Sequence, residues 1–529
     1  MSFRSILLKR SSPDTANTAN TANTEASSHL DRRELMKLGV FGGLLSAVGG
    51  LLPRGLQAAD LSGVGAAAAS DDWSAISPFL RGNHAPVREE RTDLTLEIEG
   101  HLPHELAGTF LRNGPNPQFK PLKRYHWFDG DGMVHAVQLK DGQASYLNRY
   151  IHTRAFELER QAGRALYQSI TEPPFMCKAP RREPRNKNTA NTALLHHGGK
   201  LLALWEGGEP YELNLPNLGT VGAYNFKGGL KHAFTAHPKV DPVTGELLTF
   251  GYRIERTPYV SYSVFGPDHS LRHSVPIEIP RSVMMHDFAI TEHYSIFLDL
   301  PEIFDLWRAV RGKSPLVFMP ELGARLGVMP RYGKASELKW FEIDPCYVFH
   351  VVGAWEEEQE LVLVACRYPR FPEFLDGEND SQAARTTFSS FYEWRLNLLS
   401  GKVLERALDD QPSEFPQVNP RLIGRQARYT YSVGSKSGSL VKFDLQTQRR
   451  QEVTTFGPSS EPMFVAHPDA RTEDHGWVVS LCYNATTQKS ELVVLDAASF
   501  DPEPVARVLL PVRVPFGFHA AWVPDAQTA

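Results

Sequence analysis

Short apolar runs separated by turn residues make up most of the chain after residue 90. Each run is rich in leucine, valine, isoleucine or aromatic residues and is bounded by Gly, Asp, Asn or Pro, as is typical of strands. Clear examples lie at residues 94–100, 201–205, 248–252, 361–365 and 491–495. Turn segments such as residues 241–245 (DPVTG) separate neighbouring runs and predict hairpins. The regular repetition predicts an all-β fold and favours the blades of a β-propeller.

Two stretches show helical rather than strand spacing. One covers residues 157–168 and the other residues 302–325. In the second stretch apolar side chains recur at intervals that place them on one helix face, at Ile303, Leu306, Trp307 and Val310. We therefore expect helices at both places, outside the blades.

The amino-terminal part has the pattern of an export signal. Arg32 and Arg33 precede an apolar run at residues 38–52, which ends at Pro53. This arrangement is typical of a twin-arginine signal. The alternative is a membrane anchor, but the run is rich in glycine and short of the ~20 apolar residues that a spanning helix needs. We therefore expect a cleaved signal and a periplasmic protein.

The expected cleavage lies near residues 58–59 or within the alanine run at residues 66–69. Residues 1–71 would then be leader and signal, and residues 72–529 a single propeller domain. The Thr-Ala-Asn repeat at residues 15–24 lacks large apolar side chains, so we expect it to be disordered.

Composition and charge restrict the class of protein further. Hydrophobic residues make up 42% of the 529-residue chain, enough for a substantial core. A chain of this length is usually two or more domains, but a large propeller forms one closed unit. The formal net charge is −5 and no basic tract is long, so we expect no nucleic-acid partner.

The cysteines are too sparse for a disulfide framework, since there are four of them with no Cys-x-x-Cys spacing. Cys346 and Cys366 could pair if they lay on neighbouring strands in an oxidising periplasm. The simpler expectation, which we favour, is that all four are buried free thiols.

Four histidines occupy distinctive apolar settings and are the candidate metal ligands: His237, His286, His350 and His519. They lie too far apart in sequence for a short metal knuckle or a helical His-x-x-x-His face. Each one alone could be a hydrogen-bonded core histidine. In a propeller, however, the innermost strand of every blade lines the central axis, so residues from distant segments can meet there. Imidazoles without carboxylate or thiolate partners suit a redox-active first-row metal such as iron.

Three motifs carry a resemblance to a known family. They are residues 108–117 (GTFLRNGPNP), residues 127–135 (WFDGDGMVH) and residues 514–519 (VPFGFH). In this order they closely resemble the carotenoid cleavage oxygenase family, and the resemblance extends from about residue 75 to about residue 525. It implies a seven-bladed β-propeller with a helical and loop cap over the central axis.

The resemblance also implies the chemistry. The four histidines would hold one Fe(II) per chain and leave two coordination positions open for dioxygen. The implied reaction cleaves a carbon–carbon double bond of a carotenoid or apocarotenoid into two carbonyl products, with no catalytic side chain beyond the metal centre. In related enzymes the helical segments contact a membrane, so a peripheral membrane contact is expected in this protein too.

Three glutamates match the family residues that hold the second nitrogen of the ligand imidazoles: Glu206, Glu414 and Glu461. His467 has a setting like that of His237, but we expect it in a surface turn before Asp469. The resemblance assigns no ligand role to four further histidines, His126, His135, His196 and His197.

The family pattern also indicates a substrate tunnel over the iron. Four residues match its apolar walls: Trp205, Met285, Phe349 and Phe415. Thr192 matches a threonine whose methyl group crowds an open coordination position. An apolar polyene is therefore the expected substrate.

Cleavage of a lignostilbene- or resveratrol-type stilbene is the main alternative. Relatives that cleave hydroxylated stilbenes carry a lysine directly before the first of the three glutamates and a tyrosine further upstream. This chain has Trp205 at the first position, and residues 169–173 contain no tyrosine. We therefore favour a carotenoid or apocarotenoid substrate.

Two other classes of protein make different predictions. A propeller that only binds a partner is expected to have lost a ligand histidine, and this chain has lost none. A calcium-type propeller hydrolase is expected to use acidic clusters, for which Asp129 and Asp131 are the nearest candidates. They belong to the oxygenase-like motif and lack a glutamate at EF-hand spacing, so we expect a structural turn.

Overall fold

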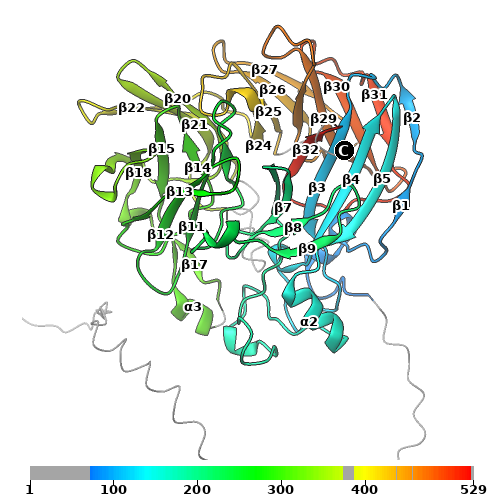
Figure 1. Ribbon diagram of the computed structural model, residues 1–529, viewed down its shortest axis with the longest axis horizontal. Coiled ribbons are helices and arrows are strands. Elements are labelled where there is room, and N and C mark those ends of the chain that lie inside the picture. The colour runs from blue at the N-terminus through cyan, green and yellow to red at the C-terminus, as the bar shows by residue number, and fades with distance from the viewer. Residues whose placement is uncertain (1–71, 312, 373–386, 436–437, 456, 526–529) are drawn as a thin grey trace, which may run out of the picture. The chain divides into compact units, whose positions relative to one another are not determined.

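In the computed structural model, sheets of antiparallel strands are arranged around a central axis (Figure 1). The structure describes residues 72–311, 313–372, 387–435, 438–455 and 457–525, all within one compact unit, Asp71–Ala529. The predicted leader and twin-arginine signal lie outside these residues. Within the described ranges seven sheets of four or five strands form the blades, which confirms the seven-bladed β-propeller.

The blades follow the order of the chain, and the first-named strand of each blade is the one nearest the axis. Blade I consists of β32 (Ala520–Pro524), β3 (Gly108–Pro115), β4 (Gly132–Lys140), β5 (Gln143–Tyr150) and β1 (Thr92–Asp93). Blade II consists of β6 (Ala193–His197), β7 (Lys200–Leu204), β8 (Tyr211–Leu213) and β9 (Thr220–Ala223). Blade III consists of β10 (Lys239–Val240), β11 (Leu247–Tyr252), β12 (Val260–Phe265) and β13 (Leu271–Ile277).

The remaining four blades complete the ring. Blade IV consists of β14 (Phe288–Ile290), β15 (Tyr294–Asp299), β18 (Ala324–Pro330) and β19 (Lys339–Ile343). Blade V consists of β20 (Tyr347–Glu357), β21 (Glu360–Tyr368), β22 (Ser390–Asn397) and β23 (Val403–Ala407). Blade VI consists of β24 (Glu414–Gln417), β25 (Tyr429–Val433), β26 (Leu440–Asp444) and β27 (Arg449–Val453). Blade VII consists of β28 (Met463–Ala466), β29 (Gly476–Asn484), β30 (Lys489–Asp496), β31 (Ala506–Leu509) and β2 (Glu97–Gly100).

Both ends of the described chain close the ring. Strand β32 near the carboxyl end pairs with β3, and Phe110 lies opposite Trp522. Strand β2 near the amino end pairs with β31, and Ile98 lies opposite Val508. Blades I and VII therefore each contain strands from both ends of the chain, and this pairing holds the ring of blades closed.

Apolar side chains between adjacent blades form the core. The second strand of blade V is buried along nearly its whole length, because both of its faces pack against neighbouring blades. Its residues Leu361 and Leu363 join Ile296 and Leu326 of blade IV in one cluster. The outer strand β13 instead alternates between exposed and more buried positions, since one face meets solvent.

One of the two predicted helices is present, with shifted ends. Helix α2 (Arg154–Ala162) begins after Thr153, whose Oγ1 accepts a hydrogen bond from the N–H of Phe156. It ends at Gly163, which has a φ of +64° that suits glycine. Residues 163–168 therefore lie beyond the helix.

The helix predicted at residues 302–325 is largely wrong. Strands β16 (Glu302–Phe304) and β17 (Leu316–Phe318) pair there as a two-stranded ribbon around a five-residue helix, α3 (Leu306–Val310). Prolines at 301, 315 and 320 leave no room for a longer helix, and Ile303 forms a bridge with Val283.

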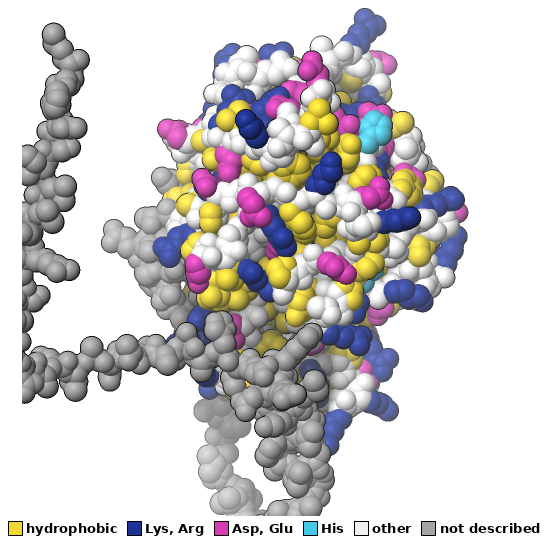
Figure 2. Space-filling view, turned by 90° about the vertical axis from the view of Figure 1, so that its left-hand side faces the viewer, with side chains coloured by type: hydrophobic (Ala, Val, Ile, Leu, Met, Phe, Trp, Pro, Cys, Tyr) yellow, Lys and Arg dark blue, Asp and Glu magenta, His cyan; other side chains and the backbone are white. Residues whose placement is uncertain are grey.

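The remaining regular elements are short, and none of the described helices is long and apolar enough to cross a bilayer. The 3₁₀ turns lie at Pro78–Leu80, Gly82–His84, Trp127–Asp129, Pro174–Met176, Phe226–Gly228, Pro320–Leu322, Ala335–Glu337 and Pro420–Leu422. All four cysteines are buried free thiols, so Cys346 and Cys366 are not paired. On the face drawn in Figure 2, basic and acidic side chains are interspersed.

Candidate metal centre

The four candidate histidines meet on the propeller axis. His237 lies just before β10, His286 just before β14, His350 within β20 and His519 directly before β32. These are the innermost strands of blades III, IV, V and I. One ring nitrogen from each histidine lies within 4.8 Å of the others, and the Nε2 atoms of His237 and His286 are 3.0 Å apart.

Local backbone irregularities help to aim these side chains. The pairing of β20 with β21 shifts between Val348 and Val351, so that the segment containing His350 carries an extra residue. A β-bulge of this kind redirects a side chain next to a site. His519 is held from both sides, because its N–H donates to Thr192 O (3.1 Å) and its carbonyl accepts from the N–H of Asn113 (3.0 Å).

Each of the three predicted glutamates contacts one of these imidazoles. The Nδ1 of His286 lies 2.7 Å from Glu206 Oε2, and that of His519 lies 3.0 Å from Glu461 Oε1. The Nδ1 of His350 bonds Glu414 Oε2. A carboxylate at Nδ1 keeps the proton there, so the Nε2 lone pair is free to face the axis.

Two further residues hold the glutamates, and sequence analysis did not identify them. The Tyr252 hydroxyl donates to Glu206 Oε1 at 2.7 Å, and Gln417 Nε2 donates to Glu461 Oε1 at 2.8 Å. Gln417 lies three residues after Glu414 in the same strand, a polar side chain in an otherwise apolar segment. Tyr252 ends a strand-like run and gave no such signal.

Burial and nearby charges shift the pKa values of these imidazoles in different directions. Burial, together with the other histidines, lowers the pKa of His237 and His350 well below the usual value. Burial opposes protonation of His286 as well, but the Glu206 carboxylate outweighs it and raises its pKa. The Nε2 of His350 is buried and has no hydrogen-bond partner among the described residues. Such an atom needs a ligand, so this neutral donor set fits a divalent metal.

Two of the predicted pocket residues lie against the histidine rings. Phe349 packs edge-on against His286, with ring centroids 5.3 Å apart, and Phe415 stacks on His350 at 5.0 Å. Phe415 has a φ of +55°, an uncommon backbone conformation for a bulky residue, beside a register shift in β24. Its N–H donates to Glu414 Oε2 at 2.8 Å. Two successive residues of this turn therefore contact His350, Phe415 by stacking on its ring and Glu414 at its Nδ1.

For the other three predicted pocket residues, the structure gives contacts with groups other than the imidazole rings. The Thr192 hydroxyl donates to Asn191 Oδ1 at 3.1 Å, which fixes the rotamer of its side chain. Trp205 precedes Glu206 and covers Gly207, where a Cβ atom would lie 2.5 Å from the indole ring. Met285 is buried in the core cluster of blades III and IV.

The three motifs that carry the family resemblance meet in space next to His519. The N–H of Phe518 donates to Asn113 O at 3.0 Å, which joins the last motif to the first. The Trp127 ring lies 4.8 Å from that of Phe518, and its Nε1 donates to Phe516 O at 3.3 Å. The three motifs therefore contact one another beside His519, and the second and third contribute aromatic rings.

The other histidines lie outside the cluster. His467 accepts a hydrogen bond from the N–H of Asp469 in a turn, as predicted, and stacks on His475. Protein groups bond the rings of His126, His135 and His197, and His196 lies in strand β6.

The Asp-Gly-Asp-Gly segment is a structural turn. Asp129 accepts hydrogen bonds from the N–H groups of His126 and Ile170 (2.6 and 2.9 Å). Asp131 pairs with Lys187 at 2.7 Å and accepts from the N–H of Gln118 at 3.1 Å. Protein donors thus occupy the acidic oxygens that a calcium site would need.

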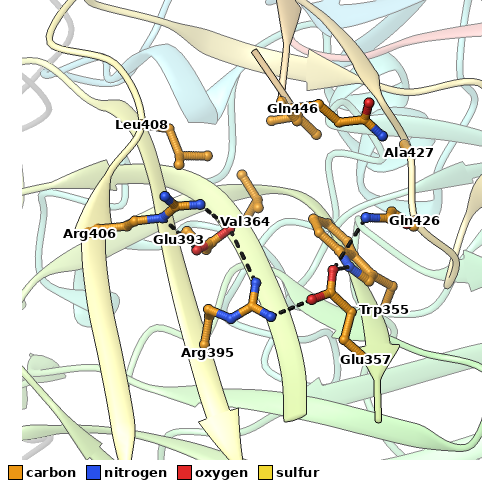
Figure 3. A pocket seen from close by; sticks show the side chains of 11 residues that line it. Trp355, Glu357, Val364, Glu393, Arg395, Arg406, Leu408, Gln426, Ala427 and Gln446 are labelled. Carbon is orange, nitrogen blue, oxygen red and sulfur yellow. Dashed lines mark hydrogen bonds and ion pairs between the residues drawn. The ribbon is translucent and has the colours of Figure 1, made fainter. Parts of the chain in front are cut away.

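A pocket of about 250 Å³ is lined by residues from all four strands of blade V and by loop residues of blade VI (Figure 3). Its charged residues neutralise one another. Arg395 pairs with Glu357 and Glu360, and Arg406 pairs with Glu393 at 2.7 Å. The pocket shares no lining residue with the histidine cluster.

Comparisons with known proteins agree with this site. The Retinal pigment epithelial membrane protein family model matches residues 84–524. Carotenoid 9,10(9',10')-cleavage dioxygenase 1 of Pisum sativum is 39% identical over 489 residues, covering 85% of this chain and 90% of the relative.

Two solved structures have the same fold. Lignostilbene dioxygenase of Pseudomonas brassicacearum superposes with a TM-score of 0.79 at 31% identity, covering 85% of this chain and 99% of that chain. A variant of Synechocystis apocarotenoid oxygenase superposes with a TM-score of 0.75 at 27% identity, covering 83% and 97%. With the family model and the Pisum sativum relative, they show that this chain belongs to the carotenoid cleavage oxygenase family.

Proposed function

We propose that the protein is a non-haem Fe(II) dioxygenase that cleaves a carbon–carbon double bond of a carotenoid or apocarotenoid with dioxygen, giving two carbonyl products. The observation that carries the proposal is the convergence of His237, His286, His350 and His519 with no anionic group among them. Neutral nitrogen donors of this kind suit a redox-active divalent metal. One ion per chain would be held by these four side chains.

Iron bound at this centre would activate dioxygen at its remaining coordination positions. The protein residues would hold and shape the site. Glu206, Glu414 and Glu461 fix the imidazoles, and the rings of Phe349 and Phe415 would shield the centre from water and contact an apolar chain. The reaction needs no side-chain nucleophile or general acid, so the position of the substrate relative to the metal would decide which bond breaks.

The choice of substrate class rests on Trp205 and on the relatives. The Pisum sativum and Synechocystis proteins are named for cleavage of carotenoids and oxidation of apocarotenoids. An indole at position 205 offers no ammonium group to hold a phenol, and it suits a polyene better. Stilbene cleavage is the second candidate, because lignostilbene dioxygenase has the same fold at 31% identity.

A peripheral membrane contact is part of the proposal. Large apolar side chains are exposed on α3 and on the segment after α2, and both helices lie at the lower edge of Figure 1. They include Trp307 (43% exposed) and Phe175 (72% exposed). Exposed apolar groups of this size are typical of a surface that enters the lipid interface, from which a polyene could be taken. A periplasmic location, through the twin-arginine signal, remains part of the proposal.

The decisive experiment is aerobic incubation of the iron-loaded protein with apocarotenals, full-length carotenoids and hydroxystilbenes, followed by mass analysis of the products. We expect aldehydes from carotenoid-type substrates and none from the His350→Ala variant. Cleavage of stilbenes alone would show that the proposed substrate class is wrong, and it would leave the proposed metal centre in place. Turnover of no substrate by protein that binds iron would contradict the proposed activity.

A further inference from the structure

A buried ion pair joins two of the segments that carry the histidines. Lys239 Nζ lies 2.8 Å from Asp287 Oδ1. Asp287 directly follows His286, and Lys239 is the second residue after His237. The Asp287 side chain is only 2% exposed, so the contact is shielded from solvent and from salt.

The second oxygen of the same carboxylate reaches a third segment. The N–H of Val351, the residue after His350, donates to Asp287 Oδ2 at 2.9 Å. Val351 borders the register shift in β20. Within its own segment, Asp287 Oδ1 also accepts from the N–H of Phe288 at 2.7 Å. One carboxylate therefore connects the innermost strands of blades III, IV and V.

This contact joins blades at the axis, where the ligand histidines lie. Backbone ladders run within each blade, from the axis outward, and adjacent blades meet mainly through apolar side chains. Apolar packing alone does not fix the position of one strand along another as sharply as directed, charge-assisted hydrogen bonds do. The relative positions of three histidines thus depend on a contact that packing does not supply.

We propose that Lys239 and Asp287 are positioning residues that set the spacing of His237, His286 and His350 and so raise the affinity of the site for a divalent metal. Asp287 bonds Lys239 and the backbone N–H groups of Val351 and Phe288, so the pair acts through the backbone next to the ligands. Because Lys239 neutralises Asp287, the pair does this without adding net charge beside the metal. The inference rests on the proposed metal centre.

The test is a Co(II) titration of metal-free protein against a competing chelator, with the visible spectrum of bound Co(II) as a second readout. We expect Asp287→Asn to weaken Co(II) binding about tenfold or more, the range found for residues that support metal ligands. The amide replaces one acceptor with a donor and cannot satisfy Lys239, Val351 and Phe288 together. The changed spacing should also alter the Co(II) absorption bands, which a merely less stable fold would leave unchanged.

A matched control comes from another buried pair. Lys442 Nζ lies 2.9 Å from Asp474 Oδ2, and it also bonds the carbonyls of Ala497 and Ala498 in blades VI and VII. Asp474→Asn breaks a Lys–Asp contact of the same kind that touches no ligand segment. It should lower thermal stability and leave both Co(II) affinity and spectrum unchanged.

The outcomes separate the inference from the function on which it rests. Failure of the unaltered protein to bind Co(II) or Fe(II) would overturn the metal centre itself. Normal binding by that protein and equal binding by Asp287→Asn would overturn only the positioning role. If Asp287→Asn does not fold, the double variant Asp287→Asn/Lys239→Met decides, because it leaves no unpaired buried charge. An unchanged affinity and spectrum there would also reject the inference.

Discussion

Tyr252 donates its hydroxyl hydrogen to Glu206 Oε1 at 2.7 Å, on the carboxylate whose other oxygen bonds His286. Glu206 is the most exposed of the three glutamates, with 15% of its side chain accessible against 9% for Glu414 and 3% for Glu461. Burial and the neighbouring carboxylate raise the pKa of Tyr252 well above the usual value, so it remains a donor. The most exposed imidazole partner thus has the support of a second side chain.

Removal of this hydroxyl should loosen the metal site. We expect Tyr252→Phe to lose about 1 kcal/mol of metal-binding free energy, or roughly fivefold in affinity, as for a single hydrogen bond. Titration with metal against a competing chelator measures this loss of affinity. Tyr262→Phe is the control, because the Tyr262 hydroxyl accepts from Ser295 within the core and touches no glutamate of the site. Equal effects of both variants would show that Tyr252 acts only on stability.

Loss of the Glu461 charge should have a larger effect. Its carboxylate accepts from both His519 Nδ1 and the N–H of Ala520 (3.0 and 2.6 Å). The amide of Glu461→Gln cannot accept from both and from Gln417. We expect metal affinity to fall about 10–100-fold, measured by the same titration. Glu491→Gln, which alters a buried carboxylate bonded to Asn484 and Arg507, should bind metal normally.

The sequence was sufficient to identify the residues nearest the axis. The four histidines and three glutamates lie in motifs whose local pattern resembles the family, so each was found without knowledge of its contacts. Lys239, Asp287 and Tyr252 act on those residues through contacts between blades, which local patterns do not encode. A charged residue directly after His286 in an apolar segment was the one signal available for Asp287.

Local spacing also misled us at residues 302–325. The apolar residues there have helical intervals, but Ile303 pairs with Val283 from a distant segment and the flanking prolines limit α3 to Leu306–Val310. Tertiary pairing overrode local periodicity, as it commonly does for short segments. The number of blades could be predicted only from the family resemblance, because no fixed repeat is visible in the sequence.

The side chain at position 205 should affect which substrates the protein cleaves. Trp205→Lys places an ammonium group directly before Glu206, as in relatives that cleave hydroxylated stilbenes. We expect turnover of an apocarotenal to fall at least tenfold, because desolvating an unpaired charge beside an apolar chain costs several kcal/mol. Product analysis with apocarotenal and hydroxystilbene measures the change, with Trp205→Phe as the uncharged control. Unchanged apocarotenal turnover by the lysine variant would remove position 205 from the substrate pocket.

Acid stability should depend on His135 in blade I. Burial lowers the pKa of His135 from 6.5 to about 3, while its Nδ1 contacts the Tyr146 hydroxyl at 2.8 Å. Between these values the unfolded chain is protonated there and the folded chain is not. The free energy of unfolding therefore falls as pH falls below about 6.5, by about 1.4 kcal/mol per unit from this group.

The variant His135→Gln removes this dependence and keeps a side chain that can bond Tyr146. Urea unfolding measures the free energy of unfolding at pH 7.5 and at pH 5.5. The change in this free energy between the two pH values should be about 1 kcal/mol smaller in the variant than in the unaltered protein. Both proteins must be measured in the same metal state. An identical pH difference would mean that His135 is protonated in the folded protein as readily as in the unfolded chain.

Membrane binding should depend on helix α3. Leu306, Trp307 and Val310 are 48%, 43% and 55% exposed, on the segment between β16 and β17. Trp307 supplies the largest apolar surface of the three, and an indole is favoured at the lipid interface. We expect Trp307→Ser to reduce sedimentation with liposomes several-fold while turnover of detergent-solubilised substrate stays normal. Leu399→Ser is the control, because Leu399 is 76% exposed in the turn after β22 in blade V. Equal liposome binding by the unaltered protein and the Trp307 variant would exclude α3 as the contact.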